Sequence, residues 1–397
     1  MMKPRLAILQ QHPALYRDLI FKKVNERSYI DITVLTMSVI DFGHSYRPKS
    51  TIPYPNHFLG KIMRLKYLGY FNPGIFKQLF LSNYDIYLTH TGSITGLIVI
   101  LYTWLSRNAL IWSNDSVLFF QPGNAIMKKI RYLVLRQLFR KTDAFWVPGN
   151  ATQEYLEYHG VAQNRIFHGA YCLDLDDILL LFESAKPRRD NIRAALGLDN
   201  SHWLFLFVGR MLAFRGLKYL VEAYHFLKQR FQNVKLLLIG DGPEKPGLQA
   251  DCHRLGLSDI IFLDPVPPDR LTDYYAAADI YITPALGEHY SLALAQAAIC
   301  GLPMISTDRV GAVKDYLLDG ETGFIVPAED SQALAAAMAR LIASRDLAKE
   351  MGEKAAASAK HRTITWAAEQ LEAAAFQAID ISKRGKFTLQ HVTESLT

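Results

Sequence analysis

Two arginines in the second half of the chain have the residue type and the position expected of a phosphate site. Arg210 and Arg215 follow the apolar run 203–208 and precede a helical pattern, so both lie at a turn between a strand and a helix. Arginine presents a fixed fork of donors to phosphate oxygens, and a helix start adds backbone N–H groups and a positive dipole end. The pair predicts neutralisation of a diphosphate, although two surface arginines at an ordinary turn would fit the same residues.

An acidic residue stands before a second helix start. Glu288 precedes a helix predicted over 292–300, which Ser291 would cap. From these positions Glu288 and Gln296 could reach a sugar-like ligand lying across the helix start. Backbone N–H groups for phosphate oxygens would come from His289, Tyr290, Ser291 and Leu292. By position alone, Glu288 is explained equally well as an acid that complements the helix dipole.

Polar residues also follow strand-like runs in the first half of the chain. They are Tyr16 and Arg17 after the run 5–10, His90 at the end of 84–90, and Asn114 and Asp115 after 109–112. Carboxyl ends of parallel strands share one edge of a sheet, so we expect these side chains to gather at the edge where such sheets bind ligands. A structural histidine and a turn aspartate would explain His90 and Asp115 as well.

Strand-like runs alternate with helical patterns in both halves. The apolar runs are 5–10, 31–36, 84–90, 109–112 and 144–148, then 203–208, 235–239, 260–263, 280–283 and 304–306. Such alternation favours parallel βαβ units, and hence two doubly wound α/β domains. The polar, proline-containing stretch 183–191 is the predicted linker between them.

Composition is that of an ordinary globular protein with material for two cores. The chain has 397 residues, of which 50% are hydrophobic and 21% charged, with a formal net charge of +6. The first 190 residues carry 23 Lys and Arg against 14 Asp and Glu, so the remainder carries 21 against 24. A basic half suggests an anionic partner: nucleic acid, anionic lipid and a phosphorylated acceptor all fit. A basic half without a special partner fits too.

Cysteine usage and hydropathy predict a cytoplasmic protein. Cys172, Cys252 and Cys300 are odd in number and far apart, which argues against a disulfide framework or a zinc site. The N-terminus is interpreted as a first strand rather than a signal peptide. The longest apolar stretch, 96–105, has about half of the ~20 residues that a membrane-spanning helix needs.

Four segments of the second half, in order and spacing, resemble the retaining glycosyltransferases of the GT-B fold, family 4. They are 208–224, 236–249, 260–307 and 310–334. The resemblance implies two Rossmann-like domains facing across a cleft. The expected parts are an acceptor-binding domain at 1–185, a nucleotide-sugar domain at 192–362, a helix at 363–381 that crosses back, and a tail at 382–397.

The same resemblance implies roles for individual residues. Arg210 and Arg215 take the places of the diphosphate-binding pair, and Glu288 that of the glutamate that contacts donor-sugar hydroxyls. Gln296 stands where the family has a second glutamate on the nucleotide ribose, and the base would lie near Val266. The donor-binding set thus becomes Gly209, Arg210, Arg215, Asp241, Val266, Glu288, His289, Tyr290, Ser291, Leu292 and Gln296. The place of a histidine that faces the reacting carbon in many relatives reads Trp-Ser-Asn-Asp, which leaves His90 as another candidate. The resemblance thus implies an acceptor side lined by Tyr16, Arg17, His90, Asn114 and Asp115, with Asp115 as the catalytic candidate.

The chemistry implied by the resemblance is transfer of a sugar from a nucleoside diphosphate sugar with retention of configuration, without a metal or other cofactor. The acceptor would be a saccharide, a lipid-linked saccharide or a small molecule, as in polysaccharide biosynthesis. Because Gln296 replaces the glutamate and the histidine is missing, a non-catalytic nucleotide-sugar-binding or scaffold subunit is the alternative. An oxidoreductase is disfavoured because no G-x-G-x-x-G follows the first strand.

The stretch 124–141 has helical periodicity with an apolar side and six basic residues. Together with Lys61, Arg64 and Lys66 it predicts contact with an anionic membrane surface, at the inner face of the plasma membrane. We expect no nucleic-acid partner. The alternative is that its apolar side packs on the N-terminal sheet.

Overall fold

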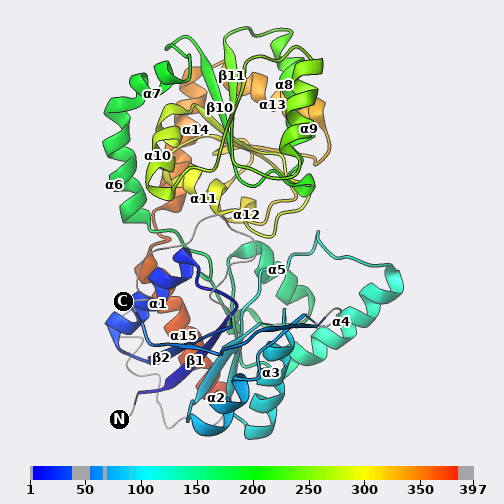
Figure 1. The fold of residues 1–397 in the computed structure, drawn as a ribbon, viewed down its shortest axis with the longest axis vertical. Helices are drawn as coiled ribbons and strands as arrows, with labels where there is room; N and C mark the ends of the chain where they lie inside the picture. Colours follow the sequence, from blue (N-terminus) through cyan, green and yellow to red (C-terminus); the bar gives the residue numbers. More distant parts are fainter. Residues whose placement is uncertain (1–2, 38–53, 66–68, 91, 383–397) are drawn as a thin grey trace. The chain divides into compact units, whose positions relative to one another are not determined.

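The computed structural model describes residues 3–37, 54–65, 69–90 and 92–382 (Figure 1). Its contacts divide the chain into two compact units. The first consists of Met1–Cys172 with Ile364–Thr397, and the second of Leu173–Thr363. Each unit is a Rossmann-like α/β domain built on a parallel sheet, as the sequence predicts. The predicted tail lies outside the described residues from position 383 onward.

The sheet of the first unit has seven strands in the order β3-β2-β1-β6-β7-β8-β9. Their bounds are β1 Arg5–Gln10, β2 Asp31–Thr36, β3 Asn56–Phe58, β6 Ile86–Thr89, β7 Ala109–Trp112, β8 Ala144–Trp146 and β9 Ile166–Phe167. All neighbours in this sheet pair in parallel. A short antiparallel hairpin, β4 Met63–Leu65 with β5 Gly69–Phe71, stands outside the sheet.

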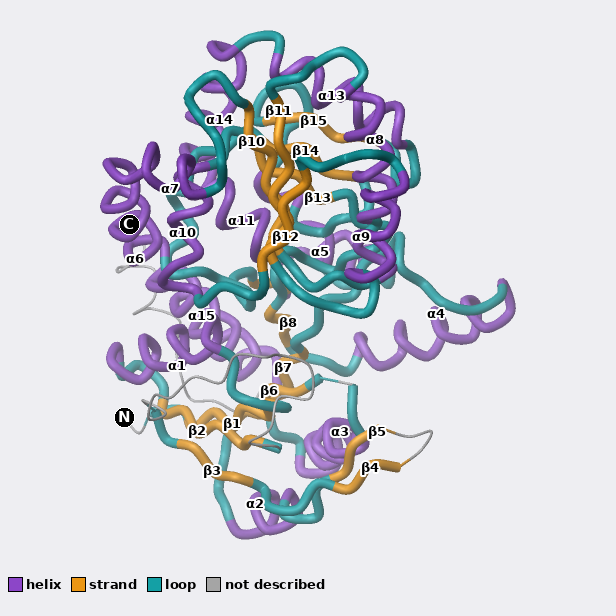
Figure 2. The backbone as a smooth tube through the Cα atoms, turned by 45° about the horizontal axis from the view of Figure 1, so that its top comes forward, coloured by secondary structure: helices purple, strands orange, loops and turns teal. Residues whose placement is uncertain are grey.

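Helices cover both faces of this sheet. They are α1 Leu15–Arg27, α2 Ile75–Leu81, α3 Ile94–Ser106, α4 Ala125–Arg140, α5 Asn150–Tyr158 and α15 Ile364–Ser382, with a 3-10 turn η1 at Gln163–Arg165. Side chains such as Ile8 and Ile111 face α1 and α15, whereas Leu9 and Leu110 face the layer of α2 to α5. This alternation is the period-2 pattern of a strand buried on both faces, and Figure 2 shows the two layers.

Helix α15 returns to the first unit from the end of the chain. It packs against α1, β7 and β8 through a stripe of alanines with Leu371 and Ile379. Arg27 of α1 pairs with Glu372 at 3.0 Å and with Glu369 at 3.2 Å. The small alanine side chains let the helix approach the sheet closely. Helix α15 is therefore held by apolar packing, and the ion pairs of Arg27 add to it.

The sheet of the second unit has six parallel strands in the order β12-β11-β10-β13-β14-β15. Their bounds are β10 Trp203–Val208, β11 Val234–Ile239, β12 Ile260–Leu263, β13 Ile280–Thr283, β14 Met304–Thr307 and β15 Gly323–Val326. The helices are α6 Leu175–Ala185, α7 Arg189–Ala195, α8 Leu217–Lys228, α9 Lys245–Arg254, α10 Pro268–Ala277, α11 Leu292–Ile299, α12 Val313–Tyr316, α13 Ser331–Ile342 and α14 Arg345–Ala359, with 3-10 turns η2 Lys186–Arg188 and η3 Ala213–Arg215. Counted from β10, the strand order is 3-2-1-4-5-6, which is the Rossmann order.

The predicted linker at 183–191 is helical, and it belongs to the second unit. Its basic residues pair with acids of α10 and of the loop that follows: Arg188 with Asp273 at 2.7 Å, and Arg189 with Asp279 at 2.6 Å. Arg193, 1% exposed, also reaches Asp279. The polar composition that suggests a solvated linker therefore reflects ion pairs between partly exposed arginines and nearly buried carboxylates, which a sequence pattern does not distinguish.

Helix α4 extends away from the sheet of its own unit (Figure 2). Among its side chains only Phe139 is fully buried, whereas Ile126, Ile130 and Leu133 are more than half exposed. The alternative that its apolar side packs on the sheet therefore fails for most of its length. No helix in the described ranges is long and apolar enough to cross a bilayer.

Candidate functional site

The residues predicted to bind a phosphorylated ligand gather at the carboxyl ends of β10, β11 and β13. At β10 the strand order reverses, because its neighbours are β11 on one side and β13 on the other. Open parallel sheets bind ligands at such a point, in the crevice beyond the strand ends. The loops there are 209–216, 240–244 and 284–291, so the fold places the predicted segments where a ligand would lie.

Backbone contacts hold the loop after β10 against the loop after β13. The N–H of Leu286 donates to the carbonyl of Phe214 at 2.7 Å. Gly216 has a φ of 66°, and a Cβ at this position would lie 2.1 Å from the carbonyl oxygen of Pro284. Only glycine combines that φ with such close approach. The two loops therefore form one rigid rim.

Arg215 and Glu288 meet across this rim. Nη1 of Arg215 forms an ion pair with Oε2 of Glu288, and their side chains are 18% and 10% exposed. Nε of Arg215 is buried and makes no hydrogen bond within the described part of the chain. Buried donors without a partner are rare in folded proteins, so this N–H can donate to an acceptor that the described residues do not supply. A diphosphate oxygen has the required charge and geometry.

A third loop, after β14, fixes the backbone of Glu288. The backbone N–H of Glu288 donates to the carbonyl of Arg309 at 2.8 Å, and the backbone carbonyl of Glu288 accepts from the N–H of Gly311 at 2.9 Å. Burial raises the pKa of Glu288 above its ordinary value, although the charge of Arg215 opposes the shift. The carboxylate is thus held in place from three loops, with the cation as its counter-charge.

The start of α11 carries strained backbone. Ser291 has a φ of 127° and a ψ of 96°, which is unusual for any residue with a Cβ. Its Oγ accepts from the N–H of Leu294 at 3.4 Å and caps the helix, as predicted. The first N–H groups, beginning with Leu292, have no partner within the helix and carry its positive dipole end. Gln296 lies one turn further on and is half-buried.

Tyr290 does not offer its side chain to a ligand at this rim. It is 4% exposed and lies beside Tyr316 and the ion pair of Arg362 with Asp315, which measures 2.7 Å. Burial and these neighbours raise the pKa of its hydroxyl well above the ordinary value. The side chain of Tyr290 therefore packs inside the second unit, and only its backbone could take part in binding. The neighbouring His289 is half-buried.

The remaining predicted residues of the second unit stand at the same strand ends. A Cβ on Gly240 would lie 2.0 Å from the carbonyl oxygen of Gly209, so the loops after β10 and β11 touch. Arg210 and Asp241 are exposed on these loops, and Val266 follows β12, half-buried. Of the two arginines expected to act as a pair, one is paired with Glu288 and the other faces solvent.

In the first unit, a cluster of aromatic and charged side chains occupies the corresponding strand ends. Arg17 lies 5.3 Å from the ring centroid of Tyr171, whose hydroxyl donates to Oδ2 of Asp115 at 3.0 Å. The rings of Tyr16 and Tyr171 meet edge to face at 5.0 Å. The structure therefore brings Tyr16, Arg17 and Asp115 together through Tyr171, a residue that the sequence did not indicate. Tyr171 precedes Cys172 after a short strand, and no spacing marks it.

His90 and Asn114 border this cluster. Burial, followed by the charge of Arg17, lowers the pKa of His90 to about 4, and His12 adds to the shift while Asp115 opposes it. The imidazole is therefore neutral at physiological pH, able to accept or donate one proton in a hydrogen bond but not to act as a cation. The side-chain amide of Asn114 donates to Ser116 at 3.4 Å.

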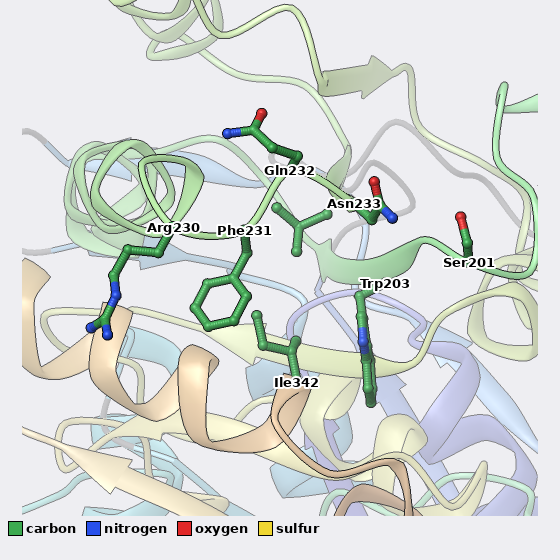
Figure 3. Close-up of a pocket in the computed structure, with 8 residues that line it drawn as sticks. Ser201, Trp203, Arg230, Phe231, Gln232, Asn233 and Ile342 are labelled. Carbon is green, nitrogen blue, oxygen red and sulfur yellow. The ribbon is translucent and has the colours of Figure 1, made fainter.

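A hollow of about 350 Å³ lies elsewhere in the second unit (Figure 3). Its lining comes from Ser201, Trp203, Arg230, Phe231, Gln232, Asn233, Val234 and Ile342. Trp203 and Val234 begin β10 and β11, so the hollow is at the amino ends of the strands, opposite to the predicted site. Within the described residues, no three His, Cys, Asp or Glu side chains are grouped to hold a metal ion.

The second unit matches a known family. Residues 188–358 fit the profile of the family described as Glycosyl transferases group 1. The D-inositol 3-phosphate glycosyltransferase of Corynebacterium glutamicum is 35% identical over 200 residues, which cover 48% of this chain and 47% of that protein. The protein of the same description from Xylanimonas cellulosilytica is 29% identical over 251 residues, 62% and 59% of the two chains. The chain thus spans about half the length of the curated relatives it matches.

Solved structures extend the likeness to the whole fold. A structure of HepE from Anabaena in complex with UDP has a TM-score of 0.71 at 18% identity and covers 94% of this chain and 98% of its own. Sucrose-phosphate synthase of Thermosynechococcus elongatus has a TM-score of 0.69 at 19% identity, with coverages of 96% and 99%. At such identities the likeness concerns fold alone. The chain therefore has the GT-B fold, and its residues 188–358 match the model of the glycosyl transferases group 1 family.

Proposed function

We propose that this protein transfers a sugar from a nucleoside diphosphate sugar, and that its second unit binds the donor. The observation that carries the proposal is the Arg215–Glu288 pair on the rim at the strand-order reversal, with a buried Arg215 N–H awaiting an acceptor. A diphosphate supplies that acceptor, and the start of α11 adds backbone N–H groups for its oxygens. Since the HepE structure is described as a complex with UDP, uridine diphosphate is the first nucleotide to test.

The proposed reaction needs few groups from the protein. The bond between the anomeric carbon and the diphosphate breaks, the acceptor oxygen bonds to that carbon on the same face, and the departing diphosphate takes the acceptor proton. Arg215 and Arg210 stabilise the charge that develops on the diphosphate. Glu288 accepts hydrogen bonds from sugar hydroxyls and thereby orients the anomeric carbon. Retention of configuration and independence from metal ions belong to this proposal.

The acceptor is assigned to the first unit. Its cluster of Tyr16, Arg17, His90, Asn114 and Asp115 offers hydroxyl, cationic, neutral imidazole, amide and carboxylate groups at the strand ends. Such a set suits the hydroxyls of a saccharide, whether free, lipid-linked or part of a small molecule. Asp115 is the group proposed to contact the reacting acceptor hydroxyl.

Calorimetry with UDP, GDP and ADP, followed by a radiolabelled-sugar transfer assay, tests the proposal. Arg215→Ala should weaken binding of the preferred nucleotide about 10- to 100-fold, because a charge-assisted hydrogen bond contributes about 1.5–3 kcal/mol. Arg230→Ala, an exposed arginine at the other end of the sheet, is the matched control and should bind normally. Failure of all three nucleotides to bind would refute the proposal.

A non-catalytic nucleotide-sugar-binding subunit is the second candidate, because Gln296 stands where the resemblance expects a glutamate. It predicts nucleotide binding that depends on Arg215 without any release of sugar from the donor. The transfer assay separates the two, since the enzyme should show turnover or slow donor hydrolysis that Glu288→Ala abolishes.

We further propose that the protein associates peripherally with an anionic membrane, at the inner face of the plasma membrane, through 124–141. Five apolar side chains on one side of α4 are 52–71% exposed: Ile126, Met127, Ile130, Leu133 and Val134. The same helix carries Lys128, Lys129, Arg131, Arg136 and Arg140. A helix with an exposed apolar side and a basic side binds the boundary of an anionic bilayer.

A further inference from the structure

The first unit has a second exposed apolar face, formed by α2 and α3. Six large apolar side chains of these helices are 42–85% exposed: Phe76, Phe80, Leu81, Leu97, Leu101 and Leu105. Soluble proteins expose single hydrophobic residues routinely, but a contiguous group of this size marks an interaction surface. We call it the α2–α3 face.

The α2–α3 face is continuous across the two helices. Leu97, Leu101 and Leu105 follow one another at four-residue spacing and so form one stripe along α3. On α2 the ring of Phe76 stacks on Phe80 at 6.4 Å, and Phe80 meets Tyr102 of α3 edge to face at 6.0 Å.

The inner side of α3 is already packed. Val99 and Ile100 are buried against the sheet together with Thr95, Gly96 and Thr103, and the helix contains no charged residue. A helix without charged residues that also has leucines on its outer side normally buries that side too. The outward stripe of α3 is therefore not required by the packing of the unit itself.

The stretch of sequence that contains α2, α3 and α4 carries a large excess of cations. Residues 42–142 carry 13 Lys and Arg but only two carboxylates, Asp85 and Asp115. Both carboxylates accept hydrogen bonds, Asp85 from the backbone N–H of Arg5 and Asp115 from the hydroxyl of Tyr171. Among the described residues near α2 and α3, Lys61, Arg64, Lys77 and Arg107 add positive charge to that of α4.

The α2–α3 face and α4 also lie on the same side of the sheet. Side chains of α2 and α3 pack on Leu9 and Tyr87, and Phe139 of α4 packs on Leu110 and Phe145; all belong to the face opposite α1 and α15. Figure 2 shows α2 and α3 on the side of the strands away from α1 and α15.

We propose that the α2–α3 face inserts its aromatic and leucine side chains into the boundary region of an anionic lipid bilayer, as a second membrane contact besides α4. The inference rests on the proposed membrane association. An anionic bilayer satisfies both features of the surface, since acyl chains accept the apolar side chains and headgroups neutralise the cations. A second copy of the chain would bring two positive surfaces together and is disfavoured for that reason.

The three cysteines are buried, so a dye can be placed selectively on an introduced one. Phe80→Cys and Leu105→Cys report on the α2–α3 face, Ile130→Cys reports on α4, and Leu180→Cys on α6 is the control, 70% exposed in the second unit. Each labelled full-length chain is titrated with vesicles of phosphatidylcholine containing, or lacking, phosphatidylglycerol. We expect blue-shifted emission at positions 80, 105 and 130 with the anionic vesicles, and none at position 180.

A triple variant measures the strength of the contact. Phe80→Ser, Leu101→Ser and Leu105→Ser together should weaken partitioning into anionic vesicles at least tenfold, because burial of each large apolar side chain strengthens binding several-fold. Since all three side chains point away from the core, the thermal midpoint and nucleotide affinity should not fall.

Three results would overturn the inference. A response at position 130 without one at 80 and 105 would leave α4 as the membrane contact and reject the α2–α3 face. A vesicle-independent shift at 80 and 105 that grows with protein concentration would identify a second copy as the occupant. No emission shift at any labelled position would reject membrane association as well. The proposed transferase function is tested separately, by nucleotide binding in calorimetry.

Discussion

The Arg215–Glu288 pair can be tested by a double-mutant cycle with Arg215→Met and Glu288→Gln. The two side chains are 18% and 10% exposed, so either one left alone would be a largely buried charge without its partner. Breaking a fully buried pair costs about 3–5 kcal/mol, and partial exposure reduces this to about 2 kcal/mol for each single variant. The double variant has no unpaired charge, and we expect its unfolding free energy within about 1 kcal/mol of wild type.

The pH dependence of the cycle follows from Glu288. Burial already raises its pKa, and Arg215 opposes the rise, so Arg215→Met should raise the pKa further. A carboxyl whose folded pKa lies above its unfolded value stabilises the fold only while protonated, and that stability is lost as the pH rises through the folded pKa. The deficit of Arg215→Met relative to wild type should therefore be larger at pH 7.5 than at pH 5.

Denaturant unfolding of the unliganded protein at both pH values measures the cycle, and the nucleotide affinity of each variant is measured beside it. A coupling energy below about 0.5 kcal/mol would show that the two charges do not stabilise each other and would refute the reasoning. The nucleotide affinity measured by calorimetry tests the pair independently, through the direction in which each single variant changes it. Glu288→Gln should keep or strengthen binding of the free nucleoside diphosphate, because it releases Arg215, whereas Arg215→Met should weaken it.

Two further outcomes test the geometry of each unit. Gly216→Ala should destabilise the second unit by about 2 kcal/mol or more and weaken nucleotide binding, because a Cβ there would meet the carbonyl of Pro284 at 2.1 Å and the φ is 66°; thermal melting and calorimetry check it, and unchanged values would contradict the rigid rim. His90→Gln should reduce the loss of stability between pH 6.5 and pH 4.5 by on the order of 2 kcal/mol, because the pKa of His90 is lowered to about 4 and the unfolded histidine takes up a proton that the folded one refuses. Parallel denaturation curves for wild type and variant across that range would contradict it.

The sequence predicts the second unit well because its strands are short, apolar and closely followed by turn residues. The predicted strand 203–208 coincides with β10, and 260–263 and 280–283 with β12 and β13. The helix cap at Ser291 is observed as well. Local patterning determines these elements, so local rules identify them.

Where distant partners decide the structure, the sequence was less informative. The stretch 183–191 resembles a linker because it is charged and contains a proline, yet its arginines find Asp273 and Asp279, which lie more than 80 residues further along the chain. Tyr171 joins Arg17 to Asp115 across the first unit, and nothing next to it in sequence announces this role. Tyr290 follows the predicted glutamate but points into the protein. Residue type and spacing do not report such tertiary contacts.

The two arginines of the second unit show how placement changes the meaning of a motif. As a sequence pair, Arg210 and Arg215 are two equivalent cations. In the structure Arg215 is paired with Glu288 and its buried Nε makes no hydrogen bond to the described residues, whereas Arg210 is exposed. Because Glu288 neutralises much of the positive charge of Arg215, we expect Arg215 to stabilise a bound diphosphate mainly through a hydrogen bond in a fixed direction. Arg210 supplies long-range attraction that salt screens. Raising the ionic strength should consequently weaken the contribution of Arg210 and leave that of Arg215 largely intact.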